Sequence, residues 1–191
     1  MPMRLISLDH LTLLALPPPE LVQVAAAAGF QHVGLRLNPA APPQEHAYPM
    51  LGQSAMRRAT RAALRDTGVA VFDFGVFRLR RGMDLDALEP VLSCAAELGA
   101  RYAVVNADEP DLQVAAALLH ALCERAQPYG IGLHLEPTPW SGVPHLHAAQ
   151  ALLQCCGHPG ARLLVDALHL ARSGGSAADV AALPPQLLGC V

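Results

Sequence analysis

Two short segments in the second half of the chain place acidic and imidazole side chains at the ends of apolar runs. Residues 132–137 read GLHLEP, and residues 164–169 read LVDALH. Glu136 ends the first run, Asp166 ends the second, and His169 follows one turn later. A carboxylate at the end of a buried strand is costly unless it is paired or bound to a cation. Oxygen ligands favour Mg²⁺ or Mn²⁺, and an added imidazole keeps Co²⁺ or Zn²⁺ open.

Other polar residues follow other apolar runs and could reach the same edge of a sheet. They are Asp9, His10, Arg36, Asn38, Asp73, Asn106, Asp108, Glu109, Arg172 and Ser173. His10 and Arg36 could contact a substrate or serve the structure alone. The group around Asn106 is interpreted as turn and helix-cap residues. Trp140 could line a sugar pocket with its apolar face or simply pack.

Several histidines and cysteines have simpler structural interpretations. His134 is interpreted as a structural histidine. His145 and His147 are spaced like a metal-binding pair, but they begin a predicted helix, where residues two apart point in different directions. The five cysteines are odd in number and contain no CxxC pair, which argues against a disulfide framework or a structural zinc site. Cys155 and Cys156 are predicted to be core and turn residues.

The elements that must position these residues alternate between strand and helix. Apolar runs predict strands at residues 4–8, 32–37, 69–74, 102–106, 131–135 and 162–165, with a seventh beginning near 187–191. Ala- and Leu-rich stretches predict helices at residues 18–28, 54–67, 84–98, 111–127, 144–156 and 177–182, several of which end at a glycine. Strict alternation implies a parallel sheet.

The first turn distinguishes the two common parallel architectures. A doubly wound dinucleotide-binding sheet carries glycines after its first strand, whereas residues 9–12 read DHLT. The sequence therefore predicts a (β/α)8 barrel type, whose functional residues follow the carboxyl ends of the strands. A closed barrel needs eight strands and about 250 residues. We expect one incomplete barrel domain over residues 1–191, with six complete units and the start of a seventh.

Composition excludes several functions. No apolar run approaches the roughly 18 residues of a membrane span, and the first residues lack a signal-peptide core, so no membrane association and a cytoplasmic location are expected. All 13 basic residues are arginine, which excludes Schiff-base and pyridoxal phosphate chemistry on a lysine of this chain. The net charge of -3 argues against nucleic acid as a partner.

At these segments the sequence resembles the xylose-isomerase-like TIM barrels, a family of sugar phosphate isomerases and epimerases. The resemblance covers essentially the whole chain and is carried by residues 7–12 (SLDHLT), 33–37 (VGLRL), the strand before Glu136, and residues 165–169 (VDALH) with the Arg-Ser-Gly that follows. It implies that Glu136 and Asp166 bind a divalent metal and that His169 contacts substrate hydroxyls. It also implies a strand-seven polar ligand and a strand-eight Glu, both expected after Val191.

The resemblance therefore implies a metal-dependent sugar or sugar phosphate isomerase or epimerase that works through an enediolate. Glu136 would hold metal and act as one acid/base, and the strand-eight Glu would be the other. His169, the other catalytic residue expected in this chain, would orient a substrate oxygen. A sugar or polyol would contact four residues: His10, Arg36, Trp140 and Arg172. One alternative is an inactive remnant whose exposed sheet edges form homo-oligomers. Another is a related metal-dependent sugar dehydratase. A nuclease acting on abasic DNA ranks low, because no basic groove is visible.

Overall fold

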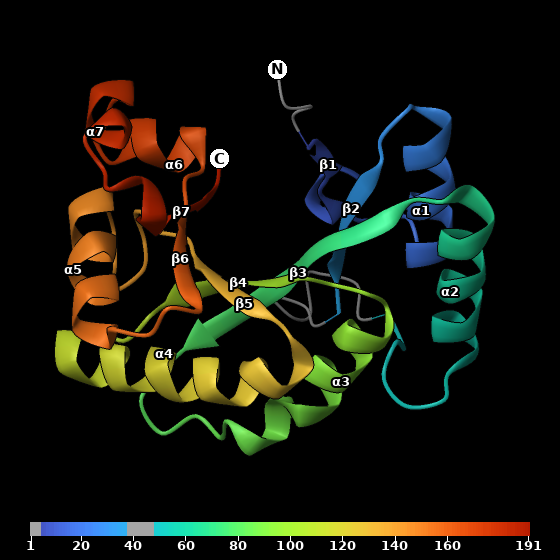
Figure 1. Ribbon diagram of the computed structural model, residues 1–191, viewed down its shortest axis with the longest axis horizontal. Coiled ribbons are helices and arrows are strands. Elements are labelled where there is room, and N and C mark those ends of the chain that lie inside the picture. Colours follow the sequence, from blue (N-terminus) through green and yellow to red (C-terminus); the bar gives the residue numbers. More distant parts are fainter. Residues whose placement is uncertain (1–4, 38–47) are drawn as a thin grey trace. The chain divides into compact units, whose positions relative to one another are not determined.

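The computed structural model describes residues 5–37 and 48–191, and within them strands and helices alternate as predicted (Figure 1). The strands are β1 (Ser7–Leu8), β2 (His32–Arg36), β3 (Ala70–Leu79), β4 (Tyr102–Ala107), β5 (Gly132–Leu135), β6 (Ala161–Leu164) and β7 (Leu188–Cys190). The α-helices are α1 (Pro18–Ala27), α2 (Ala55–Thr67), α3 (Glu89–Glu97), α4 (Leu112–Ala126), α5 (Leu146–Cys156), α6 (Ala167–Arg172) and α7 (Ala177–Ala181). Short 3₁₀ helices are η1 (His10–Leu13), η2 (Asp86–Leu88), η3 (Gln127–Tyr129) and η4 (Pro185–Leu187).

The strands form one sheet in chain order, from β1 to β7, and the pairing is parallel. Each pair of neighbouring strands is joined by a connection that contains a helix, because parallel strands require such a crossover. This confirms the predicted parallel βα fold of the TIM-barrel type. All strands therefore end on the same edge of the sheet, which is the edge that carries the candidate residues.

Helix boundaries follow from side-chain caps and glycines. Ser54 accepts a hydrogen bond from the backbone N–H of Arg57 and begins α2, and Gly68 ends it in the left-handed conformation. Asp111 caps α4 in the same way as Ser54 caps α2. Gly157 ends α5 in the left-handed conformation. The sequence signals used to predict these helices are thus the groups that define their ends.

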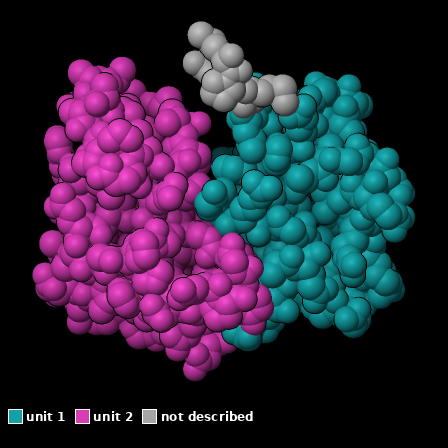
Figure 2. Space-filling model, viewed as in Figure 1, with its two compact units in different colours: residues 1–76, 88–102 teal, residues 77–87, 103–191 magenta. Residues whose placement is uncertain are grey.

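The described residues belong to two compact units, shown in Figure 2: residues 1–76 and 88–102 (unit 1), and residues 77–87 and 103–191 (unit 2). In unit 1, α1 packs against α2 (Figure 1). Its core includes the fully buried Leu21 and Leu92, and Arg57 is buried beside Glu97, with 3.2 Å between their charged atoms. The expectation of a single domain remains a prediction.

In unit 2, helices α4 and α5 pack against each other and against β5 and β6 (Figure 1). The core between them is leucine-rich, with Leu119, Leu133 and Leu152 fully buried. Residues alternate between the two faces of β5, so His134 lies on the opposite face from Leu133. There it contacts β7, with its Nδ1 atom 3.4 Å from Cys190 Sγ. This contact agrees with the structural interpretation of His134.

The largest departures from the sequence prediction concern β3, α3 and α6. Strand β3 continues through Gly75 to Leu79, so Asp73 lies within the strand. The prediction that Asp73 lies at the end of this strand is wrong. Helix α3 begins at Glu89 and not near residue 84, because Pro90 favours a first-turn position and η2 precedes it. Helix α6 was not predicted as an element. Asn38 lies outside the described residues.

Among the described residues, no helix combines the length and apolarity that a membrane crossing requires.

Candidate metal centre

Three residues of unit 2 converge where β5 and β6 end. Glu136 directly follows β5, Asp166 follows β6 by two residues, and His169 lies on α6. One carboxylate oxygen from each acid and one ring nitrogen of the histidine lie within 4.8 Å of one another, and all three side chains are partly buried. The structure therefore brings together the three residues that the sequence singled out for chemistry.

Asp166 has two geometrical roles at this point. Its Oδ1 atom accepts a hydrogen bond of 2.8 Å from the backbone N–H of His169, which makes it the N-cap of α6. The capping bond spans three residues here, and the same separation puts the His169 side chain on the side of the helix that faces the carboxylate. The structure thus gives Asp166 a capping role beside its place in the group of possible metal donors.

The surroundings of the His169 ring indicate whether a cation fits among the three converging residues. Within the part of the chain that the structure describes, its Nδ1 atom is buried and has no hydrogen-bond partner. The same atom lies 4.0 Å from Asp166 Oδ1. A buried polar atom without a partner requires an explanation, and an absent ion is one of the recognised ones. Two carboxylates and an imidazole are a donor set that divalent metals accept, so the residues fit such an ion.

Glu136 is attached to β4 as well as to β5. Its backbone N–H donates to Val105 O over 2.8 Å. The buried Asn106 side chain donates from Nδ2 to both the backbone oxygen and Oε2 of Glu136, each over 3.0 Å. Sequence reasoning missed this contact and grouped Asn106 with turn residues. An amide at the end of an otherwise apolar strand was the signal that could have revealed it.

The neighbouring acids of the same edge are already satisfied by arginines. Asp108 accepts hydrogen bonds from Arg78 and Arg80, at 3.2 and 2.9 Å. Glu109 accepts one from Arg81 at 3.1 Å and one from the backbone N–H of Asp111. The Asp111 N–H and the Arg81 guanidinium lower the pKa of Glu109. These acids hold the turn after β4, in agreement with their interpretation as turn and cap residues.

Two predicted substrate contacts of unit 2 flank the three converging residues. Trp140, in the loop after Glu136, is 60% exposed and lies edge-on to the His169 ring. More than half of the Trp140 surface is therefore accessible to solvent beside His169. Arg172 ends α6 and is exposed. Their roles as substrate contacts remain predictions.

The other two predicted substrate contacts belong to unit 1 and contact each other. His10 is fully buried. Its Nε2 atom lies 2.8 Å from Leu16 O, and its Nδ1 atom accepts the backbone N–H of Arg36 over 3.1 Å. Both ring nitrogens are thus used by the backbone. The Nε atom of Arg36 is buried and has no partner among the described residues, so Arg36 has unsatisfied capacity for an anion or hydroxyl. Asp9 caps η1.

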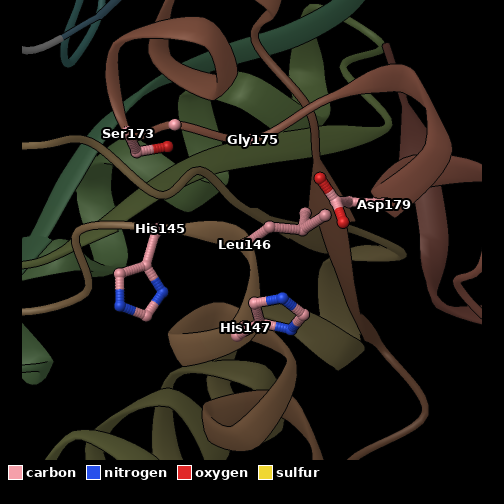
Figure 3. Close-up of a pocket in the computed structure, with 7 residues that line it drawn as sticks. His145, Leu146, His147, Ser173, Gly175 and Asp179 are labelled. Atoms are coloured by element: carbon pink, nitrogen blue, oxygen red, sulfur yellow. The ribbon is translucent and has the colours of Figure 1, made fainter.

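Figure 3 shows a separate pocket of about 230 Å³ at the start of α5. It is lined by His145, Leu146, His147, Ser173, Gly174, Gly175 and Asp179. His145 Nδ1 accepts the backbone N–H of Ala148 and so caps α5. The rings of His145 and His147 lie 6.4 Å apart, and within the described residues they join no group of converging metal donors. Their spacing therefore reflects the helix start.

The cysteines are free thiols. Cys123 on α4 and Cys156 on α5 are buried neighbours, and the hydrogen bond from the Cys123 thiol lowers the pKa of Cys156 to about 6. His158 bonds instead to Glu124, with 3.1 Å between Nε2 and Oε1. The burial of Cys156 agrees with its predicted place in the core, whereas Cys155 is exposed.

Comparison with known proteins agrees with this arrangement. The sequence profile of the xylose isomerase-like TIM barrel family matches residues 22–188. The chain belongs to this family. None of the curated proteins compared with the chain matches it.

Several solved structures superpose on nearly the whole chain. The probable 3-DHS dehydratase AsbF of Bacillus anthracis has a TM-score of 0.79 at 17% identity, covering 98% of this chain and 72% of that one. A D-psicose 3-epimerase gives 0.76 at 14% identity, covering 96% and 71%. The IOLI protein, solved with a bound zinc atom, gives 0.75 at 13% identity, covering 95% and 69%. At these identities the likeness establishes the fold.

The chain spans only part of each of these similar structures. It spans 69–72% of the three structures above. It spans only 30% of a fusion protein that joins a xylose isomerase-like TIM barrel to 4-hydroxyphenylpyruvate dioxygenase. The structures similar to this chain thus include proteins named as an epimerase and a probable dehydratase, and one solved with a bound zinc atom.

Proposed function

We propose that the chain carries the metal-binding part of a divalent-metal-dependent sugar or sugar phosphate isomerase or epimerase. The observation that carries the proposal is the convergence of Glu136, Asp166 and His169 within 4.8 Å at the ends of β5 and β6. The ends of parallel strands are where barrel enzymes carry their chemistry. The epimerase and the zinc-binding protein among the similar structures support it.

Glu136 and Asp166 would hold the ion, with His169 as a third donor or as a contact to substrate hydroxyls. When bound, such an ion acts as a Lewis acid toward a carbonyl and its neighbouring hydroxyl. Mn²⁺ or Mg²⁺ suits the two carboxylates, and Zn²⁺ or Co²⁺ suits the set with imidazole.

The protein's own groups would move the proton. A carboxylate in contact with the carbon next to a sugar carbonyl removes its proton, and the substrate becomes an enediolate. Return of the proton to the neighbouring carbon gives isomerisation, and return to the opposite face of the same carbon gives epimerisation. Glu136 is the candidate base. Trp140 would cover the sugar's apolar face, and Arg172 would bind its oxygens or a phosphate.

The test separates metal binding from proton transfer. Mn²⁺ binding is measured by titration calorimetry on the whole chain. A panel of ketoses and ketose phosphates in D₂O is then followed by NMR for deuterium uptake next to the carbonyl, which detects enediolate formation even without complete turnover. We expect saturable Mn²⁺ binding and Mn²⁺-dependent exchange with at least one sugar.

Matched variants decide which residues act. Glu136→Gln should remove exchange and weaken Mn²⁺ binding, whereas Asp66→Asn, a surface acid paired with Arg65, should change neither. Binding without exchange of any sugar would overturn the isomerase proposal but not the metal site. Elimination of water in place of exchange would favour the dehydratase alternative.

A further inference from the structure

Asn106 makes an unusual contact with the candidate base. It is the fifth residue of β4, only 4% exposed, and its side-chain Nδ2 lies 3.0 Å from two oxygens of Glu136. One is the backbone carbonyl and the other is Oε2. With the backbone bond from Glu136 to Val105, three hydrogen bonds attach Glu136 to β4. The residue is therefore held by the neighbouring strand although it lies beyond the end of its own.

The chemistry of an amide fixes the direction of this contact. A side-chain NH₂ group has two hydrogens, and the two oxygens of Glu136 accept one each. The opposite amide orientation would place Oδ1 against two further acceptors, which is repulsive. The hydrogen-bond network alone thus assigns Nδ2 to the Glu136 side. Asn106 determines both the backbone position and the side-chain rotamer of Glu136.

The neutral charge of the amide matters as much as its geometry. An arginine in this place would neutralise the carboxylate, as Arg78 and Arg80 do for Asp108. A second acid would repel it. An asparagine orients Glu136 and leaves its negative charge in place beside Asp166. Outer groups that orient ligands commonly change metal affinity 10- to 100-fold when removed.

We infer that Asn106 is a positioning residue, which orients Glu136 toward a divalent cation while preserving its charge. The inference rests on the proposed function, because it assigns Glu136 to a metal centre. It adds a residue on β4 to a site otherwise formed after β5 and β6. The inference also predicts that the metal affinity of the centre depends on Asn106, although Asn106 is not itself a metal ligand.

The test compares Asn106→Leu, which has nearly the same shape and no donor, with Asn106→Ser, which keeps a hydroxyl donor. Mn²⁺ affinity is measured by calorimetry and by quenching of Trp140, the chain's single tryptophan. We expect the leucine variant to bind Mn²⁺ at least about 10-fold more weakly and the serine variant to recover part of the loss. The matched control is Thr138→Val, because Thr138 is 2% exposed and its hydroxyl has no partner among the described residues. It should bind as the parent does.

A second measurement needs no metal. In the metal-free chain, the Asn106 NH₂ protons should exchange slowly with solvent, and Glu136→Leu should accelerate that exchange. Parent-like Mn²⁺ affinity in a folded Asn106→Leu protein would overturn the inference and leave the proposed function standing. If Asn106→Leu does not fold, parent-like affinity in Asn106→Ser together with fast NH₂ exchange in the parent would overturn it. If the parent itself binds no Mn²⁺, the metal centre fails, and the role assigned to Asn106 fails with it.

Discussion

Trp140 lies edge-on to the His169 ring, with 4.8 Å between the ring centroids and 88° between the ring planes. The indole is nevertheless 60% exposed, so the contact uses its edge and leaves much of its surface available. Large exposed aromatic surface beside a polar centre is a feature of binding sites for ligands with both apolar and polar faces. This relationship leads to the first prediction.

Trp140→Ala should raise the sugar concentration needed for half-maximal proton exchange about 2- to 13-fold, because an aromatic contact of this kind contributes about 0.5–1.5 kcal/mol. Mn²⁺ affinity should stay unchanged, since indole is no ligand. Trp140→Phe should retain most of the sugar affinity. Exchange kinetics at fixed Mn²⁺ measure both effects, and an unchanged half-saturation in the alanine variant would contradict the role in sugar binding.

Asp166 offers a way to separate capping from metal binding. Asp166→Asn keeps an oxygen that can accept the His169 N–H, so the unfolding free energy should stay within about 0.5 kcal/mol of the parent. Its Mn²⁺ affinity should fall at least about 10-fold, because a charged ligand is lost. Asp166→Ala should lose the same affinity and also about 1 kcal/mol of stability. Urea unfolding and calorimetry test the pair, and equal metal affinity in Asp166→Asn and parent would rule out Asp166 as a ligand.

The loop that carries Trp140 approaches the turn after β4 very closely at Gly142. A Cβ atom at this position would lie 2.6 Å from the backbone oxygen of Glu109. Gly142→Ala should therefore destabilise the chain by about 1–3 kcal/mol, because backbone must move. At Gly175 the nearest atom would be the end of the Leu170 side chain, which can rotate, so Gly175→Ala should cost less. Denaturant unfolding gives both values, and the reverse order would contradict the packing described.

His134 predicts how stability depends on pH in the metal-free chain. Burial, with a smaller effect from the Arg162 charge, lowers the pKa of His134 from 6.5 to about 4. Between these values the unfolded chain binds a proton that the folded chain does not, so stability falls as pH falls from about 6.5 to 4. The loss attributable to this one group is about 3 kcal/mol by pH 4.

The matched variant is His134→Gln, which cannot titrate and should show a shallower fall in unfolding free energy over the same pH range. The groups near His134 include Arg162 on β6 and Cys190 on β7. Parallel pH profiles for parent and variant would show that His134 is not responsible.

The sequence allowed prediction of the residues at the candidate centre but not of all their contacts. Glu136 and Asp166 were identified because a charged residue that ends an apolar strand is conspicuous. His169 was identified because it lies one turn beyond Asp166 and because the family resemblance implies a substrate contact there. The extension of β3 through Gly75 was missed, since glycine in an apolar run resembles a strand end.

The contact between Asn106 and Glu136 could not be predicted for a different reason. It joins residues of two consecutive strands, and it depends on which side chains meet across the pair. That relation is set by three-dimensional register and not by local pattern. The same limitation applies to His134, whose position on its own strand was clear but whose partner on β7 was not.

The two carboxylates of the centre come from consecutive βα units, Glu136 after β5 and Asp166 after β6, with the whole of α5 in the intervening chain. An ion held by both would act as a reversible cross-link that closes this segment. Closing a loop lowers the conformational entropy available to the unfolded chain. A divalent ion would therefore resist the separation of β5, α5 and β6 during unfolding, and a chelator would loosen that segment of the chain first.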